Sequence, residues 1–133
     1  MIESYPTATK QVLIIDDEET IQTVVRFGLN LSHNWGVSCA SSGQEGLELA
    51  EQEQPDVILL DVMMPDMDGI ATFKVLQSNP LTQDIPVILL TAKAQTADRR
   101  QFQTLGVNGV ITKPFNSLNL AAEIATILHW SVE

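Results

Sequence analysis

Carboxylate, hydroxyl and amino side chains stand at the ends of the apolar runs in this sequence. Asp16-Asp17 follow one run, Asp61 and Thr91 end two others, and Lys113 follows a fourth. Carboxylate oxygens are the ligands that a hard cation such as Mg²⁺ prefers, and a carboxylate can also act as a nucleophile. A lysine and a hydroxyl group could stabilise charge on a phosphoryl group. Together these residue types predict metal-assisted phosphoryl transfer, provided that the fold brings them together.

The apolar runs alternate with segments of helical spacing, and this alternation predicts the fold class. Strands are predicted at 12–15, 37–41, 57–61, 87–91 and 110–112, and helices at 19–31, 43–54, 70–78, 96–105 and 117–128. The run Val57–Leu60 is apolar at every residue, which is typical of a strand buried on both faces of a parallel sheet. The sequence therefore predicts an α/β fold in which helices cover both faces of a doubly wound parallel sheet.

Parallel strands bring their carboxyl ends to one edge of the sheet, and open α/β sheets bind their ligands at that edge. In the strand order 2-1-3-4-5, the first and third strands are neighbours, so that Asp16, Asp17 and Asp61 crowd together. Like charges this close raise the pKa of one carboxylate unless a cation intervenes. Lys113 supplies one positive charge, and a magnesium ion would supply more.

Length and charge limit the remaining possibilities. The 133 residues suit one domain at 11–130, with a lead-in at 1–10 and a tail at 131–133. The formal net charge of −10 disfavours direct binding to nucleic acid or anionic lipid. The single Cys39 excludes an internal disulfide and a cysteine zinc site. Because the first residues do not resemble a signal peptide and no apolar segment approaches the ~20 residues of a membrane span, we expect a cytoplasmic protein.

The whole pattern resembles the receiver domain of two-component response regulators, from about Gln11 to Leu128. The resemblance is carried by Ile14-Ile15-Asp16-Asp17-Glu18, Leu59-Leu60-Asp61-Val62-Met63-Met64-Pro65-Asp66-Met67-Asp68-Gly69, Leu89-Leu90-Thr91-Ala92 and Thr112-Lys113-Pro114-Phe115. Each motif is weak alone, whereas their order at successive strand ends is specific. The resemblance implies a flavodoxin-like (βα)5 fold with the strand order 2-1-3-4-5.

The resemblance also implies a role for each carboxylate. Asp61 would accept a phosphoryl group from the phosphohistidine of a sensor histidine kinase or phosphotransfer protein. Asp17, Asp61 and the backbone carbonyl of Met63 would bind Mg²⁺ directly, and Asp16 would act partly through water. The domain would not be an enzyme beyond its own phosphorylation and dephosphorylation.

On the same resemblance, Thr91 and Lys113 would contact the phosphoryl group, and the Lys113-Pro114 peptide would be cis. One departure concerns the relay of the signal, because family members often carry an aromatic residue at the position of Val110. We expect a stand-alone receiver, since the chain ends after the fifth helix. It would act on an effector protein through the face formed by the fourth helix, the fifth strand and the fifth helix.

Other functions fit parts of the pattern. A receiver fold that works as an interaction module without phosphorylation stays open because of Val110, although the intact acidic, hydroxyl and amino set argues against it. An aspartate-nucleophile phosphohydrolase would need a second acid where Met63 stands. A nucleotide or flavin binder would favour glycines and amide donors after the first strand, where this chain has Asp16-Asp17-Glu18-Glu19.

Overall fold

The computed structural model describes residues 9–92 and 96–130, without the side chains of residues 96–99. Most of the predicted lead-in and the whole predicted tail therefore lie outside the described residues. The elements are β1 (Gln11–Ile15), α1 (Glu19–His33), β2 (Gly36–Ala40), α2 (Gly43–Glu53), β3 (Val57–Asp61), α3 (Gly69–Ser78), β4 (Val87–Thr91), α4 (Thr96–Leu105), β5 (Gly109–Thr112), the 3-10 turn η1 (Ser117–Asn119) and α5 (Leu120–Leu128).

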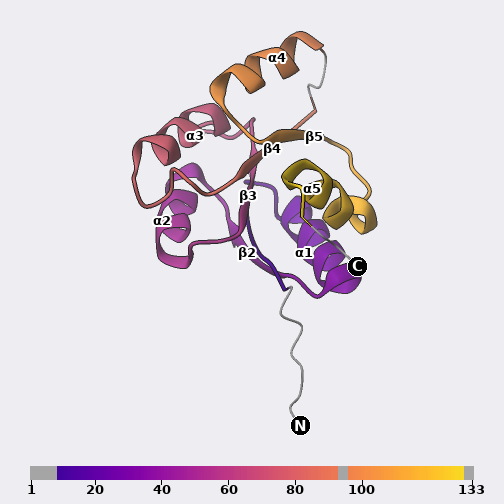
Figure 1. Ribbon diagram of the computed structural model, residues 1–133. Coiled ribbons are helices and arrows are strands. Elements are labelled where there is room, and N and C mark those ends of the chain that lie inside the picture. Colours follow the sequence, from indigo (N-terminus) through magenta and orange to yellow (C-terminus); the bar gives the residue numbers. More distant parts are fainter. Residues whose placement is uncertain (1–8, 93–95, 131–133) are drawn as a thin grey trace.

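The strands form one five-stranded sheet in the order β2-β1-β3-β4-β5, and every neighbouring pair is parallel. In Figure 1, α1 and α5 lie on one face of this sheet, and α2 and α3 lie on the other. The predicted flavodoxin-like fold and its strand order are thus confirmed. No helix in the described ranges combines the length and apolar character that crossing a membrane requires.

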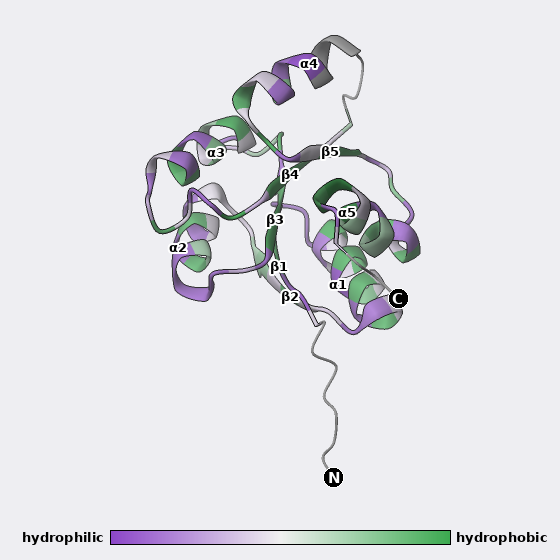
Figure 2. Ribbon diagram, in the orientation of Figure 1, coloured by the Kyte–Doolittle hydropathy of each residue, from purple (hydrophilic) through white to green (hydrophobic). Residues whose placement is uncertain are grey.

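The core consists of two apolar layers, one on each face of the sheet. Val12 and Ile14 pack with residues of α1 and α5, whereas Leu13 and Ile15 pack with residues of α2 and α3, because successive side chains of a strand point to opposite faces. Every residue of β3 and β4 is buried, and Figure 2 shows the apolar character of these central strands. Among the residues of these two strands, the polar ones, Asp61 and Thr91, are the last of each strand.

Two of the predicted helices differ from the structure by more than one residue. Helix α1 continues past the predicted end at 31 to His33, because Asn34 takes a left-handed conformation (φ 58°) and its N–H donates to the carbonyl of Asn30. The last predicted helix is divided into η1 and α5. A Cβ atom on Gly28 of α1 would lie 2.3 Å from the carbonyl oxygen of Ser117, so the glycine allows the backbone of η1 to lie directly on α1.

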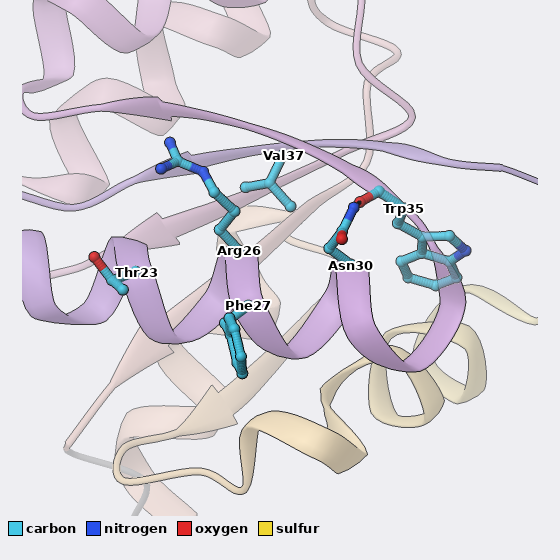
Figure 3. Close-up of a pocket in the computed structure, with 6 residues that line it drawn as sticks. All are labelled: Thr23, Arg26, Phe27, Asn30, Trp35 and Val37. Carbon is cyan, nitrogen blue, oxygen red and sulfur yellow. Dashed lines mark hydrogen bonds between the residues drawn. The ribbon is translucent and has the colours of Figure 1, made fainter.

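Figure 3 shows the shallow groove between α1 and β2. It is lined by Thr23, Arg26, Phe27, Asn30, Trp35 and Val37. The Arg26 guanidinium donates a hydrogen bond to Sγ of Cys39 at 3.0 Å. Burial raises the pKa of the Cys39 thiol, with the nearby Arg26 opposing the effect. The thiol therefore stays protonated at neutral pH, which suits a residue that contributes to packing.

Aromatic residues hold together the amino edge of the sheet, where the strands begin. Trp35 precedes β2 and is 3% exposed, and its ring meets the ring of Trp130 edge to face at 5.7 Å. The Lys10 ammonium, just before β1, lies 4.5 Å from the centre of a Trp130 ring. These contacts join the end of α5 to the beginnings of β1 and β2.

Candidate functional site

The ends of β1 and β3 place carboxylates side by side. The parallel register sets Ile15 opposite Leu60, so the next residue of each strand, Asp16 and Asp61, emerges at the same edge. Asp16 is fully buried and Asp61 is 3% exposed, whereas Asp17 faces solvent. One oxygen from each of the three carboxylates lies within 4.8 Å of the others. The structure thus assembles the acidic cluster at the carboxyl edge.

Lys113 reaches this cluster from the end of β5. Its ammonium lies 2.9 Å from Oδ2 of Asp16 and 3.2 Å from Oδ1 of Asp61. Burial works to lower the pKa of Lys113, but the hydrogen bonds and charges of Asp16 and Asp61 outweigh it, and the pKa is raised. The lysine is therefore a permanent cation at neutral pH, and it bridges the two buried carboxylates.

One lysine does not balance the negative charge. The pKa of Asp61 is raised from 3.8 to about 6, first by burial and then by the charge of Asp16, against the opposing effects of Lys113 and the backbone N–H of Met63. At neutral pH Asp61 is mainly ionised, at a cost in free energy. Three carboxylates, one of them exposed, offer the all-oxygen ligand set that Mg²⁺ prefers. The residues present therefore fit a divalent cation.

Backbone contacts fix both acidic loops. The N–H of Asp16 donates to the carbonyl of Ala40 at 3.0 Å, and Oδ1 of Asp16 accepts from the N–H of Glu18 at 2.9 Å. On the β3 side, Oδ1 of Asp61 accepts from the N–H of Met63 at 3.2 Å. A Cβ atom on Gly69 would lie 2.3 Å from the carbonyl oxygen of Asp61, so α3 can begin this close to β3 only with glycine at that position.

Thr91 and the Lys113-Pro114 peptide complete the edge. Thr91 ends β4, is 1% exposed and lies opposite Thr112 in the register. Its carbonyl accepts from the N–H of Lys113 at 2.9 Å. The Lys113-Pro114 peptide is cis, as the resemblance implied. The sequence-predicted site residues therefore come from the ends of β1, β3, β4 and β5.

Two further residues lie at the site that the sequence reasoning did not assign. Glu18, which is largely exposed, places Oε1 3.7 Å from the Lys113 ammonium. Gln22, on the second turn of α1, donates from its side-chain amide to the carbonyl of Asp16 at 2.7 Å. Glu18 belongs to the acidic run that the sequence displays, whereas no sequence pattern distinguishes Gln22 from the other glutamines. Met63, whose backbone carbonyl the resemblance assigned to the metal, is 65% exposed.

Comparison with known proteins identifies a family that matches most of the chain. Residues 12–125 match the family described as the response regulator receiver domain. The chain is 40% identical over 122 residues to the alkaline phosphatase synthesis transcriptional regulatory protein PhoP of Bacillus subtilis, covering 92% of this chain and 50% of that protein. It is 37% identical over 119 residues to the DNA-binding dual master transcriptional regulator RpaA of Synechocystis, covering 90% and 49%. The chain spans about half the length of the curated relatives it matches.

Solved structures resemble the whole described fold. The chemotaxis response regulator CheY4 of Vibrio cholerae aligns with a TM-score of 0.83 and 28% identity, covering 90% of this chain and 99% of that one. The N-terminal domain of a response regulator receiver protein from Methanoculleus marisnigri aligns with a TM-score of 0.74 and 33% identity, covering 92% and 98%. Family, relatives and structures therefore agree on one kind of domain.

Proposed function

Because the chain belongs to the family of response regulator receiver domains, we propose that it accepts a phosphoryl group on Asp61 from a phosphohistidine. Receiver domains are phosphoacceptor domains that interact with histidine kinases or phosphotransfer proteins. The observation that carries the proposal is the buried Asp61 carboxylate, with two more carboxylates within 4.8 Å and the Lys113 ammonium at 3.2 Å. In this arrangement a nucleophile, a metal site and a fixed cation share one edge of the sheet.

The hydrogen bonds on Asp61 indicate which oxygen attacks. Both bonds that described residues donate to this carboxylate, from Lys113 and Met63, end on Oδ1. We therefore assign Oδ2 as the nucleophile. As the bond from Oδ2 to phosphorus forms, the phosphorus–nitrogen bond of the donor breaks, and its electron pair returns to the imidazole nitrogen. The product is an acyl phosphate on Asp61.

The surrounding residues stabilise the transferred group. Lys113 lies close enough to neutralise charge on a phosphoryl oxygen while it keeps its contact with Asp61. The Thr91 hydroxyl would donate to another phosphoryl oxygen. Asp17, Asp61 and the Met63 carbonyl would hold Mg²⁺, with Asp16 partly through water, and the ion would supply charge neutralisation on the phosphoryl oxygens when bound. Hydrolysis of the acyl phosphate by water would return the domain to its starting state.

The output would be a change in protein contacts on the face of α4, β5 and α5. This face has a shallow hollow lined by Val110, Asn119, Ala122, Glu123, Thr126 and Ile127. Val110 has no bulky ring that could move between an inward and an outward position. Phosphorylation would therefore be read through Thr91 and the loop that follows β4. The charge of −10 favours a protein effector over direct contact with nucleic acid.

Intact-protein mass spectrometry after incubation with acetyl phosphate and Mg²⁺ tests the proposal. The unmodified chain should gain the mass of one phosphoryl group, and Asp61→Asn should gain none. Asp66→Asn is a matched control, because Asp66 is an exposed aspartate of the adjoining loop whose left-handed backbone (φ 67°) suits asparagine. Labelling of Asp61→Asn to the same extent would refute the assignment. Absence of labelling in the unmodified chain would favour an interaction module that works without phosphorylation.

A further inference from the structure

The side-chain amide of Gln22 connects two loops at the carboxyl edge of the sheet. Its Nε2 donates to the carbonyl of Asp16 at 2.7 Å and to the hydroxyl of Ser41 at 3.1 Å. The carbonyl of Ala40 lies 3.4 Å from the same nitrogen. One partly buried side chain of α1 thus holds the residues that follow β1 to the residues that follow β2.

Asp17 has no comparable support of its own. Within the described residues, its carboxylate has neither a hydrogen bond nor an ion pair, and its side chain is exposed, with one oxygen within 4.8 Å of an Asp61 carboxylate oxygen. Its direction is therefore set by the backbone, through the peptide that joins it to Asp16. The carbonyl of that peptide is the acceptor of the Gln22 amide, and the N–H of Asp16 is held by Ala40. Gln22 restrains the peptide on the side that leads into Asp17.

We propose that Gln22 is a positioning residue for the metal site, which it serves by fixing the Asp16–Asp17 peptide so that the Asp17 carboxylate faces Asp61. The inference rests on the proposed binding of Mg²⁺ by Asp17 and Asp61. Groups that orient metal ligands without touching the metal commonly change metal affinity when they are removed. Without the amide donor, the Asp16 carbonyl loses its partner, and Asp17 must be ordered when the metal binds.

The test measures Mg²⁺ binding to the unphosphorylated protein by isothermal titration calorimetry. Gln22→Met keeps the length and helix preference of the side chain but removes the amide donor. Its dissociation constant for Mg²⁺ should rise about tenfold. Gln44→Met is the control, because the exposed Gln44 side chain of α2 donates, among the described residues, only to Glu48 at 3.5 Å. Its dissociation constant should match that of the unmodified chain.

Melting temperatures separate positioning from a purely structural role. In EDTA, Gln22→Met should melt close to the unmodified chain, and the increase on adding Mg²⁺ should be smaller in the variant. An equal loss of melting temperature with and without Mg²⁺, or an unchanged dissociation constant, would overturn the inference. If Gln22→Met does not fold, Ser41→Ala decides, because it removes an exposed acceptor of the Gln22 amide. A weaker Mg²⁺ affinity in Ser41→Ala supports the inference, and an unchanged one overturns it.

The outcome for the unmodified chain separates this inference from the proposed function. If the unmodified chain does not bind Mg²⁺, the proposed metal site itself is wrong. If the unmodified chain binds Mg²⁺ and Gln22→Met binds it equally well, only the role of Gln22 is wrong, and the metal site stands.

Discussion

At the carboxyl edge of the sheet, Asp16, Asp17 and Asp61 lie close together and Lys113 bridges two of them. At the amino edge, Trp35 meets Trp130 edge to face, and Lys10 lies over the Trp130 ring. The first arrangement collects like charges, two of them buried, with a single fixed cation among them. The second collects apolar rings and places its cation over a ring face, where the interaction is favourable. The same strands join both edges.

The two ends of the strands therefore have different roles: the amino edge stabilises the fold, and the carboxyl edge holds the proposed site. The amino edge has contacts that favour the folded state in the absence of any ligand. The carboxyl edge has a carboxylate whose pKa is raised to about 6 by burial and by Asp16, which means that its ionised form costs stability. Such a cost is typical of a site that a ligand or a reaction relieves. Substitutions at the two edges should therefore have opposite effects on stability.

The largest effect is expected at the amino edge. Trp35→Ala should lower the free energy of unfolding by about 3–5 kcal/mol, because it removes a buried aromatic side chain and leaves a cavity. Urea denaturation followed by circular dichroism measures this loss, and Trp35→Phe should lose less. Calorimetric Mg²⁺ affinity at low temperature should be unchanged in Trp35→Phe. A weakened affinity there would show that the two edges are not independent.

At the carboxyl edge, a substitution is expected to raise the free energy of unfolding. In EDTA at pH 8, Asp61→Asn should raise the free energy of unfolding by about 3 kcal/mol, since the pKa of Asp61 lies about 2 units above its ordinary value and each unit corresponds to about 1.4 kcal/mol. The folded state holds this proton more tightly than the unfolded state does. The contribution of Asp61 to the stability of the unmodified chain should therefore fall as the pH rises from 3.8 to about 6.

The advantage of Asp61→Asn should accordingly disappear below pH 3.8, where Asp61 is protonated in both states. Thermal melts of both proteins across this range provide the measurement. A destabilised Asp61→Asn at pH 8 would contradict the view that the carboxyl edge is under electrostatic strain. Asp66→Asn is the control for the loss of one exposed carboxylate.

A smaller stabilisation is expected from the metal. Magnesium at ten times its dissociation constant should add about 1.4 kcal/mol to the free energy of unfolding, because it binds the folded state alone. Sodium chloride at the same ionic strength is the control for general screening. A melting temperature that Mg²⁺ does not move beyond the control would argue against a cation site among these carboxylates.

The smallest effect concerns Lys10. Lys10→Met should lower the free energy of unfolding by about 0.5–1 kcal/mol, because it removes a cation from the face of Trp130 while keeping an apolar side chain there. High salt should leave the loss largely in place if the contact is partly shielded from water. An unchanged free energy of unfolding in Lys10→Met would show that the Lys10 ammonium does not stabilise the amino edge, which would leave the contact between the two tryptophan rings.

The sequence allowed much of the carboxyl edge to be predicted. Apolar runs that end in Asp61 and Thr91 identify buried parallel strands together with their last residues, and parallel strands share one edge whatever the packing around them. These inferences depend on periodicity and chain direction, which a single sequence displays. The strand order that placed Asp16 beside Asp61 came instead from the resemblance to receiver domains.

Other features could not be predicted, because they depend on tertiary packing. The Gln22 amide reaches Asp16 only through a particular side-chain rotamer on α1, and other glutamines of the chain look the same in sequence. The contact between Trp35 and Trp130 requires the end of α5 to meet the start of β2. The division of the last helix arises where Gly28 admits the backbone of η1, a contact between distant parts of the chain.

Borohydride reduction tests most directly whether Asp61 carries the phosphoryl group. Borohydride converts an aspartyl phosphate to homoserine, and tandem mass spectrometry of the digested protein then locates the changed residue. After reaction with acetyl phosphate and Mg²⁺, we expect homoserine at position 61 and unchanged aspartates at Asp16, Asp17 and Asp66. Homoserine at any of those other positions, with position 61 unchanged, would contradict the assignment of Asp61 as the phosphoacceptor.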